Sequence, residues 1–210
     1  MRYRGVIFDL DGVLCSTDRY HYLAWKQLAD RLSIPFDETV NNRLRGVSRM
    51  ASLEIILEKS PVAYSAQEKE ALAAEKNETY RKLLGGMSRS DLAGGALETL
   101  RTLRGRSVLL AVGSSSRNAP FILEKIGLDG FFDAVVDGNA ITRSKPDPQV
   151  FVLAAQRLSL PPAACLVVED AHAGVEAAVN GGFDCAAMGD AKDDPRARYR
   201  LERLEDLTAI

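Results

Sequence analysis

The chain has 210 residues, with 27 Lys and Arg against 29 Asp and Glu, so its formal net charge is only −2. This length allows one domain with an insertion or two modest domains. The balanced charge, without a basic run, argues against a nucleic acid or a membrane surface as partner. No apolar stretch is long enough to span a bilayer, and Asp9 interrupts the first apolar run too early for a signal peptide.

The three cysteines, Cys15, Cys165 and Cys185, lie far apart and have few histidines near them. This odd number, without a Cys-x-x-Cys pair, argues against a zinc site or a disulfide framework. Reduced thiols are typical of the cytoplasm, which we predict as the compartment of this protein.

The first predicted element is a short buried strand, Val6–Leu10, with β-branched and aromatic residues followed by acids. Asp9 and Asp11 stand at its carboxyl end. Residues two apart on an extended chain point the same way, and Gly12 allows a sharp turn directly after them. We therefore expect both carboxylates to face one crevice, where their repulsion requires a positive partner.

Residues 17–87 have the apolar periodicity of helices and contain no convincing strand. The segment Ser65–Glu68 resembles a capping box, and Gly85 with Gly86 predicts the end of the helix that follows it. This region is predicted to be a small helical bundle, with its clearest helical patterns at residues 20–32, 50–59 and 68–84.

After residue 95, predicted helices alternate with predicted strands at residues 107–115, 132–138, 165–171 and 184–190. This alternation predicts a parallel sheet covered on both faces. The first strand has no partner in the helical segment, so we expect it to join the later sheet. The predicted fold is α/β, a doubly wound parallel-sheet (Rossmann-like) core of residues 1–15 and 93–210 with an inserted α-helical domain of residues 16–92.

Four polar clusters fall where predicted strands end, and open parallel sheets bind ligands at that edge. Together they supply four carboxylates, one lysine, one arginine and several hydroxyl and backbone donors. Oxygen ligands without cysteine or histidine favour Mg²⁺. The clusters are Asp9 with Asp11, Ser114–Asn118, Lys145 with Pro146, and Glu169 with Asp170.

Each cluster also has an ordinary structural interpretation. An Asp-x-Asp-Gly segment often forms an Asx-turn, and acidic residues such as Glu169 and Asp170 suit a helix N-terminus. The Ser114–Asn118 segment could cap a helix, and Lys145 could be solvated. Taken singly, His21, Arg45 and Arg49 are typical of interface or surface positions. The joint occurrence of the four clusters at strand ends favours one functional site.

The motifs "FDLDGVL", "VGSSSRNAP", "RSKPDPQVF" and "VVEDAHAGVEAA" occur in the order used by the haloacid dehalogenase superfamily, which the whole chain resembles. Within it, "YHYLAWKQLA", "RLRGVSRMASLEIIL" and "EKNETY" are similar to the β-phosphoglucomutases. The resemblance implies a Mg²⁺-dependent phosphotransferase whose helical insertion is a cap domain. It also implies an enzyme that acts on a small sugar phosphate, isomerising β-glucose 1-phosphate and glucose 6-phosphate through the bisphosphate. We expect this enzyme to be a monomer.

The resemblance implies a role for each matching residue. Asp9 would be the nucleophile that becomes an aspartyl phosphate, and Asp11 the acid and base. Lys145 and Ser114 would balance the charge of the phosphoryl group. The metal would be held by Asp9, the main-chain carbonyl of Asp11, Glu169 and Asp170. The substrate would be bound by His21, Trp25, Arg45, Arg49, Ser52, Lys76, Ser116, Arg117 and Asn118.

In a mutase, the phosphate that is not being transferred must also be held. Arg49 with Ser116–Asn118 would form this distal clamp, while His21 and Lys76 would couple cap closure to the placement of Asp11. Two other functions compete with this one. The first is a sugar-phosphate phosphatase on the same scaffold, in which water accepts the phosphoryl group. The second is a binding protein without turnover, which the presence of every reacting group disfavours.

Overall fold

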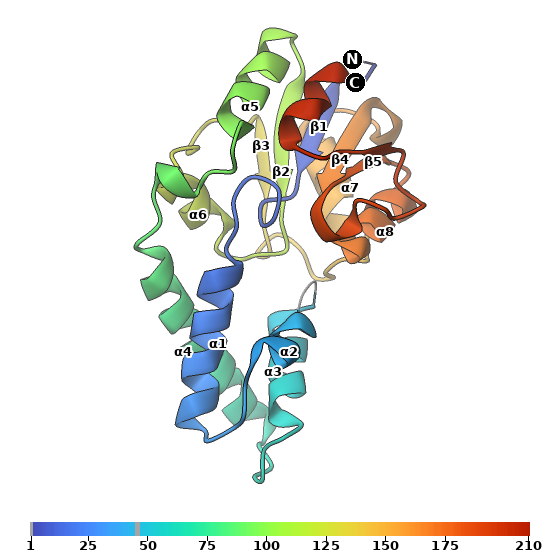
Figure 1. Cartoon of the computed structure of the whole chain (residues 1–210). Helices are drawn as coiled ribbons and strands as arrows, with labels where there is room; N and C mark the ends of the chain where they lie inside the picture. Colours follow the sequence, from blue (N-terminus) through green and yellow to red (C-terminus); the bar gives the residue numbers. More distant parts are fainter. Residues whose placement is uncertain (1, 45–46) are drawn as a thin grey trace. The chain divides into compact units, whose positions relative to one another are not determined.

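The computed structural model describes residues 2–44 and 47–210, which form two compact units (Figure 1). We call Met1–Ser16 with Ser88–Ile210 the α/β unit, and Thr17–Met87 the helical unit. The chain passes into the helical unit after Ser16 and returns after Met87. The residues next to these two crossings pair inside the α/β unit, where Cys15 forms an antiparallel bridge with Leu92.

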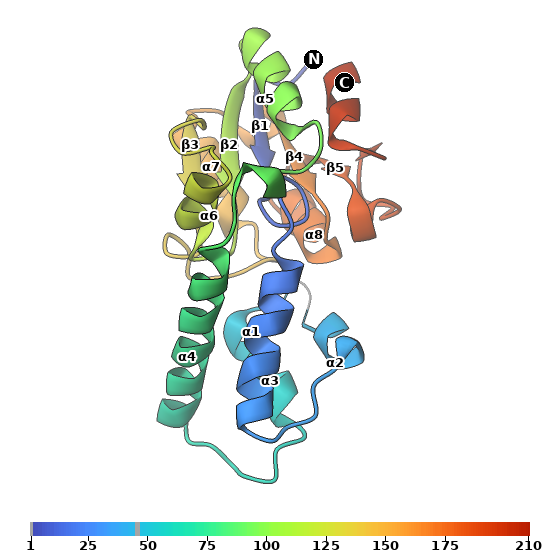
Figure 2. The same ribbon diagram turned by 60° about the vertical axis from the view of Figure 1, so that its left-hand side comes forward.

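The α/β unit contains one six-stranded parallel sheet with the order β3-β2-β1-β4-β5-β6 (Figures 1 and 2). Its central strand, β1 (Gly5–Phe8), is fully buried between β2 (Leu109–Gly113) and β4 (Cys165–Glu169). The chain order reverses on the two sides of β1, which makes its carboxyl end the switch point where such sheets bind ligands. The other strands are β3 (Ala134–Val136), β5 (Asp184–Ala187) and β6 (Tyr199–Arg200).

Helices cover both faces of this sheet. Ile7, Ala111 and Val167 face the cluster that contains the buried residues of α7 (Gln149–Arg157) and α8 (His172–Asn180). The alternate strand residues point to the other face, where α5 packs beside β2 and the C-terminal turn η4. The predicted doubly wound sheet is therefore confirmed. The remaining elements are η1 (Arg89–Asp91), α5 (Ala96–Gly105), α6 (Ala119–Lys125), η2 (Pro162–Ala164), η3 (Gly189–Ala191) and η4 (Leu204–Ala209).

The helical unit packs α1 (Asp18–Arg31) and α3 (Arg49–Leu57) against α4 (Ala66–Leu84). The predicted capping box at Ser65 and Glu68 is present, and α4 ends before Gly85 as predicted. A further helix, α2 (Glu38–Asn42), was not predicted, because five residues are too few to show a period. Its N-terminus is capped by Asp37, whose carboxylate accepts from the Val40 N–H at 2.9 Å.

Some predicted strands are too long. The first strand ends at Phe8 rather than Leu10, because the chain turns back after Asp11, where the Gly12 N–H donates to the Cys15 carbonyl. The cysteines are free and buried. No helix in the part of the chain that the structure describes combines the length and the apolar character of a membrane span.

Candidate active site

The carboxyl end of β1 places two acidic residues at the centre of the sheet edge. Asp9 is 7 % exposed, and its N–H donates to the carbonyl oxygen of Val168 on β4 at 2.9 Å. Asp11 lies two residues on, half-buried, at the start of the turn. Gly12 makes this turn possible, because its backbone has a φ of 84°, which glycine adopts without strain.

Lys145 supplies the positive charge that these crowded carboxylates require. Its side chain is 10 % exposed, and its ammonium group donates to Asp9 Oδ1 at 2.5 Å and to Glu169 Oε1. Burial alone would lower the pKa of Lys145, but the charges of Asp9 and Glu169 outweigh burial and raise it. Lys145 is therefore protonated at neutral pH and offsets part of the negative charge.

Glu169 and Asp170 stand at the end of β4, beside β1. Glu169 Oε2 accepts from the backbone N–H groups of Asp170 at 2.9 Å and Ala171 at 3.0 Å. Two glycines leave room for these carboxyl groups. A Cβ on Gly174 would lie 1.9 Å from Glu169 Cδ, and a Cβ on Gly12 would lie 2.0 Å from Asp170 Oδ2. Neither glycine tolerates a side chain while the carboxyl groups keep these positions.

The pKa values of Asp9 and Asp170 lie above the ordinary range of aspartate. Burial is the largest cause for both groups. Lys145 lowers the pKa of Asp9, whereas Glu169 and Asp11 raise it, and Asp9 is the largest charge that raises the pKa of Asp170. Neighbouring carboxylates disfavour one another's ionisation, because their negative charges repel. A cation of higher charge than an ammonium would stabilise their ionised forms.

The same carboxylates were predicted to hold Mg²⁺. Within residues 2–44 and 47–210, no three Asp, Glu, His or Cys side chains are arranged as ligands of one ion. Instead, the Lys145 ammonium pairs with one carboxylate oxygen of Asp9 and one of Glu169. The donor set nevertheless fits a divalent cation, because it consists of oxygen atoms and because its crowded carboxylates have raised pKa values.

Ser114 lies at the same edge of the sheet, directly after β2. It is buried, and its N–H donates to the carbonyl oxygen of Val136 at 3.0 Å. Its hydroxyl accepts from the Ser116 N–H at 3.1 Å, and the Ser116 hydroxyl accepts from the Asn118 N–H at 3.2 Å. These two turns hold the loop against the strand ends, with Asn118 buried and Arg117 exposed.

In the helical unit, His21, Trp25 and Lys76 form one cluster with Tyr80. The Lys76 ammonium lies 2.8 Å from His21 Nδ1 and 4.6 Å from the ring centroids of Trp25 and Tyr80. His21 also stacks on Tyr80, with ring centroids 4.1 Å apart. Burial lowers the pKa of His21 far below its ordinary value, and the charges of Lys76 and Arg49 lower it further. Neutral His21 therefore accepts a hydrogen bond from Lys76 through Nδ1.

The other predicted substrate residues are divided between the two units. Arg49 is the first residue of α3 and is half-buried, and Ser52 lies buried one turn later in the same helix. Arg45 lies outside the described residues. The Ser116–Asn118 segment belongs to the α/β unit.

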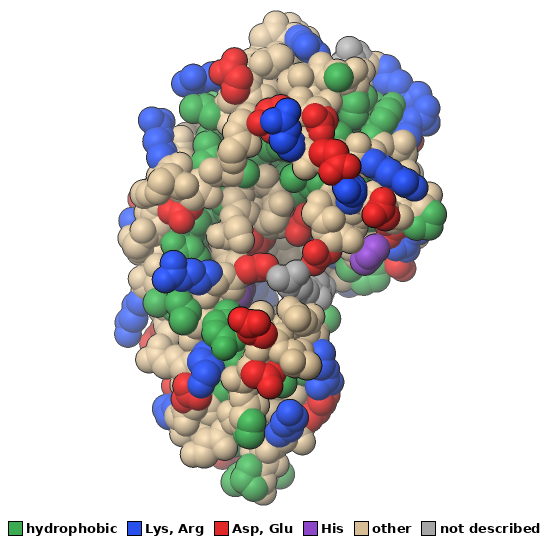
Figure 3. Space-filling view, viewed as in Figure 1, with side chains coloured by type: hydrophobic (Ala, Val, Ile, Leu, Met, Phe, Trp, Pro, Cys, Tyr) green, Lys and Arg blue, Asp and Glu red, His purple; other side chains and the backbone are tan. Residues whose placement is uncertain are grey.

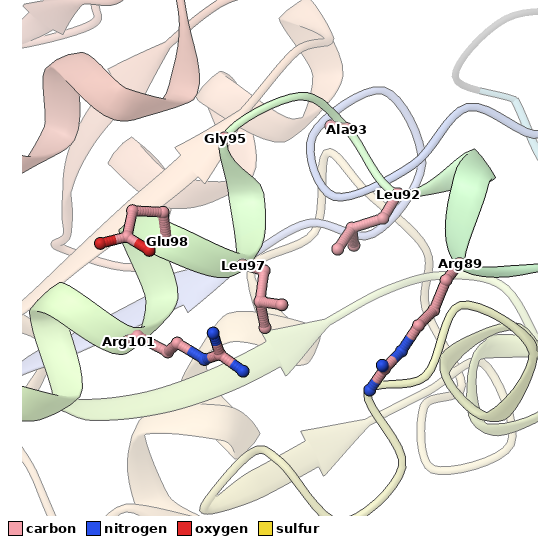
Figure 4. Close-up of a pocket in the computed structure, with 7 residues that line it drawn as sticks. All are labelled: Arg89, Leu92, Ala93, Gly95, Leu97, Glu98 and Arg101. Atoms are coloured by element: carbon pink, nitrogen blue, oxygen red, sulfur yellow. The ribbon is translucent and has the colours of Figure 1, made fainter.

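A cavity of about 310 Å³ also lies in the α/β unit, lined by Leu92 and Leu97 with Arg89 and Arg101 on either side (Figure 4). Its lining includes none of the predicted site residues. On the part of the α/β unit seen in Figure 3, several acidic and basic side chains of the described residues lie next to one another.

Two contacts at the site were not predicted from the sequence. Phe151 was expected only as an apolar residue of a helix, but its ring centroid lies 4.6 Å from Lys145 Nζ. Gly174 was likewise expected only as part of a helix, and it makes room for Glu169. The sequence contains no local signal for either contact, because both depend on how helices pack on the strand ends.

Residues 3–182 match the family model of the haloacid dehalogenase-like hydrolases. The chain belongs to this family. It is 39 % identical over 207 residues to the β-phosphoglucomutase of Bacillus subtilis, a match that covers 98 % of this chain and 92 % of the relative. It is 31 % identical over 183 residues to a phosphorylated carbohydrates phosphatase of Thermotoga maritima. That match covers 86 % of this chain and 82 % of the relative.

Among solved structures of haloacid dehalogenase-like proteins, a β-phosphoglucomutase from Clostridium difficile matches with a TM-score of 0.90 and 32 % identity. That match covers 98 % of this chain and 93 % of the other. The predicted resemblance to the haloacid dehalogenase superfamily and to β-phosphoglucomutases is thus confirmed.

Proposed function

We propose that this chain interconverts β-glucose 1-phosphate and glucose 6-phosphate through β-glucose 1,6-bisphosphate and an aspartyl phosphate on Asp9. The observation that carries the proposal is the environment of Asp9, a buried carboxylate at the end of the central strand that accepts a hydrogen bond from Lys145. The identity of 39 % to a β-phosphoglucomutase over nearly the whole chain supports the sugar phosphate as substrate.

In the transfer step, a carboxylate oxygen of Asp9 forms a bond to phosphorus while the bond from phosphorus to the sugar oxygen breaks. Asp11 gives a proton to the leaving sugar oxygen, and in the reverse direction it removes the proton from the accepting hydroxyl. Lys145 and Ser114 would donate hydrogen bonds to the phosphoryl oxygens and stabilise their charge. Transfer from phospho-Asp9 to the free 6-hydroxyl of β-glucose 1-phosphate then forms the bisphosphate again and completes the cycle.

We infer that the cofactor is Mg²⁺, held by Asp9, the main-chain carbonyl of Asp11, Glu169 and Asp170. When bound, it would polarise the phosphoryl oxygens and offset the negative charge around the nucleophile. The raised pKa values of Asp9 and Asp170 support a cation at this position.

The helical unit, Thr17–Met87, would supply most of the cap, which we place at residues 16–92, with the core at residues 1–15 and 93–210. Arg49 would hold the phosphate that is not transferred, together with Ser116–Asn118, because arginine binds phosphate through two parallel hydrogen bonds. The contact between His21 and Lys76 supports a role for this pair in linking cap closure to Asp11.

Within the cap, Trp25 and Ser52 would line the sugar site, together with Arg45. The proposed partner is thus one small sugar phosphate, bound by a cytoplasmic monomer. The formal net charge of −2 supports this partner over a nucleic acid.

A sugar-phosphate phosphatase is the second candidate, because a relative with 31 % identity is named a phosphorylated carbohydrates phosphatase. The two functions differ in what accepts the phosphoryl group from Asp9. The enzyme is labelled with radioactive acetyl phosphate and mixed with β-glucose 1-phosphate. The measurement is the ratio of labelled sugar phosphate to labelled inorganic phosphate, where sugar phosphate means the bisphosphate plus glucose 6-phosphate. A high ratio indicates a mutase, and a low ratio indicates a phosphatase.

Arg49→Ala sharpens this experiment. A charge-assisted hydrogen bond is worth roughly 1.5–3 kcal/mol, so transfer to the sugar should slow by about ten- to a few-hundred-fold, while labelling by acetyl phosphate stays fast. Arg31→Ala is the matched control, since Arg31 is an exposed cap arginine paired with Glu75. An unchanged product ratio in Arg49→Ala would refute the distal clamp, and a parent enzyme that yields almost only inorganic phosphate would favour the phosphatase.

A further inference from the structure

Phe151 on α7 is buried against the ammonium group of Lys145. The ring has no exposed surface, and its centroid lies 4.6 Å from Lys145 Nζ. A cation over the face of an aromatic ring is attracted by the negative charge of that face, more strongly where water is excluded. Because only 10 % of the Lys145 side chain is exposed, this contact is largely shielded from water and belongs to the stronger kind.

The ring is fixed by its other neighbours. Phe183 packs against it edge-on, with ring centroids 6.3 Å apart and planes at 68°. On β2, a Cβ on Gly113 would lie 2.9 Å from Phe151 Cδ1, so the ring fills the space that this glycine leaves. Gly113 directly precedes Ser114. The ring that contacts Lys145 is therefore packed on the strand end that presents Ser114.

The other contacts of the ammonium change during the proposed reaction. Lys145 has three protons to donate, and within the described chain Asp9 and Glu169 accept two of them. When Asp9 bonds to phosphorus, its carboxylate becomes an acyl phosphate and the negative charge moves to the phosphoryl oxygens, so the hydrogen-bond partners of Lys145 change. The face of Phe151 is unchanged by this step.

We propose that Phe151 is a positioning residue, whose ring face keeps the Lys145 ammonium in place while Asp9 alternates between carboxylate and acyl phosphate. This inference rests on the proposed transfer through Asp9. It predicts that the negative charge of the ring face matters, and not only its volume.

Ring fluorination tests this point, because fluorine withdraws charge from the face with little change of shape. Phe151 is replaced by phenylalanines that carry one, three or five ring fluorines. The readouts are the rate of Asp9 labelling by acetyl phosphate and the calorimetric affinity for tungstate, a tetrahedral oxyanion. Both should fall stepwise, by about two- to thirty-fold over the series. The same series at Phe183, whose ring packs edge-on against Phe151, should lower both much less.

A double-mutant cycle assigns the effect to the lysine. In a Lys145→Gln background, fluorination of Phe151 should no longer change tungstate affinity. A flat series at Phe151, an equal decline at Phe183, or an undiminished decline in Lys145→Gln would each overturn the inference. If the parent chain is never labelled on Asp9, the proposed function fails, while the tungstate series still decides whether the ring face of Phe151 holds the Lys145 ammonium.

Discussion

Replacing Gly174 by alanine should destabilise this protein, although the same change stabilises most helices. In a helix, alanine is favoured over glycine by up to about 1 kcal/mol. Here, the added Cβ would lie 1.9 Å from Cδ of Glu169, whose side chain is only 1 % exposed. Glu169 must therefore leave its position, or α8 must move away from β4.

The magnitude follows from the contacts that Glu169 would lose. Its buried carboxylate pairs with Lys145 and accepts from the N–H groups of Asp170 and Ala171. Breaking a buried ion pair costs about 3–5 kcal/mol, which the preference of the helix for alanine offsets by about 1 kcal/mol. We therefore expect the free energy of unfolding of Gly174→Ala to fall by about 2–4 kcal/mol.

Urea unfolding followed by circular dichroism measures this loss as a lower midpoint at constant slope. Gly105→Ala is the matched control, because Gly105 also lies in a helix and a Cβ there would meet nothing within 4 Å. The control should keep or raise the midpoint. If Gly174→Ala behaved like Gly105→Ala, the reasoning that Gly174 makes room for Glu169 would be refuted.

Four other perturbations test the reacting groups and one buried carboxylate. Asp9→Asn should abolish labelling by acetyl phosphate, whereas Asp11→Asn should only slow it, and mass spectrometry of the peptide that contains residue 9 distinguishes the two results. Chelation should stop labelling, and Mg²⁺ but not Ca²⁺ should restore it, because the longer and more flexible coordination of Ca²⁺ misplaces the attack; full labelling after exhaustive chelation would contradict the metal site. Hydrogen bonds from Arg196, and to a lesser extent from His172, lower the pKa of Asp194 in the folded protein. The ionised Asp194 therefore stabilises the fold above the pKa of an unfolded aspartate. This stabilisation is lost as the pH falls through the lower pKa of the folded state. Asp194→Asn should thus unfold more easily at neutral pH, by about 1.5–3 kcal/mol, and a urea series that shows an equally steep acid dependence in the variant would argue against this assignment.

The fold was predictable wherever a pattern is long. Alternating helices and strands after residue 95 predict the parallel sheet, and the capping box at Ser65 predicts where α4 begins. Short elements were missed for a physical reason, as two of them show. The helix α2 depends on its cap at Asp37 and on packing, and β6 has only two residues that pair with β5. Neither element is specified by its own few residues.

At the candidate site, the sequence identifies the polar groups but not the contacts between them. Carboxyl ends of parallel strands meet at one edge, which is why Asp9, Ser114 and Glu169 could be grouped in advance. Lys145 reaches Asp9 across 136 positions of the chain, so its partners are defined only in the folded sheet. Phe151 and Gly174 carry no polar group, and their roles follow from what they touch.

The charges at this edge explain why one lysine is not sufficient for the proposed chemistry. Asp9, Asp11, Glu169 and Asp170 can carry four negative charges, and a phosphoryl group brings more. The structure pairs Lys145 with two of these carboxylates, yet the pKa values of Asp9 and Asp170 remain raised. In the proposed step Asp9 would attack phosphorus only as a carboxylate, because a protonated carboxyl group is a poor nucleophile. A divalent cation beside Asp9 and Asp170 would keep both ionised, and Lys145 could then turn from Asp9 to the phosphoryl oxygens.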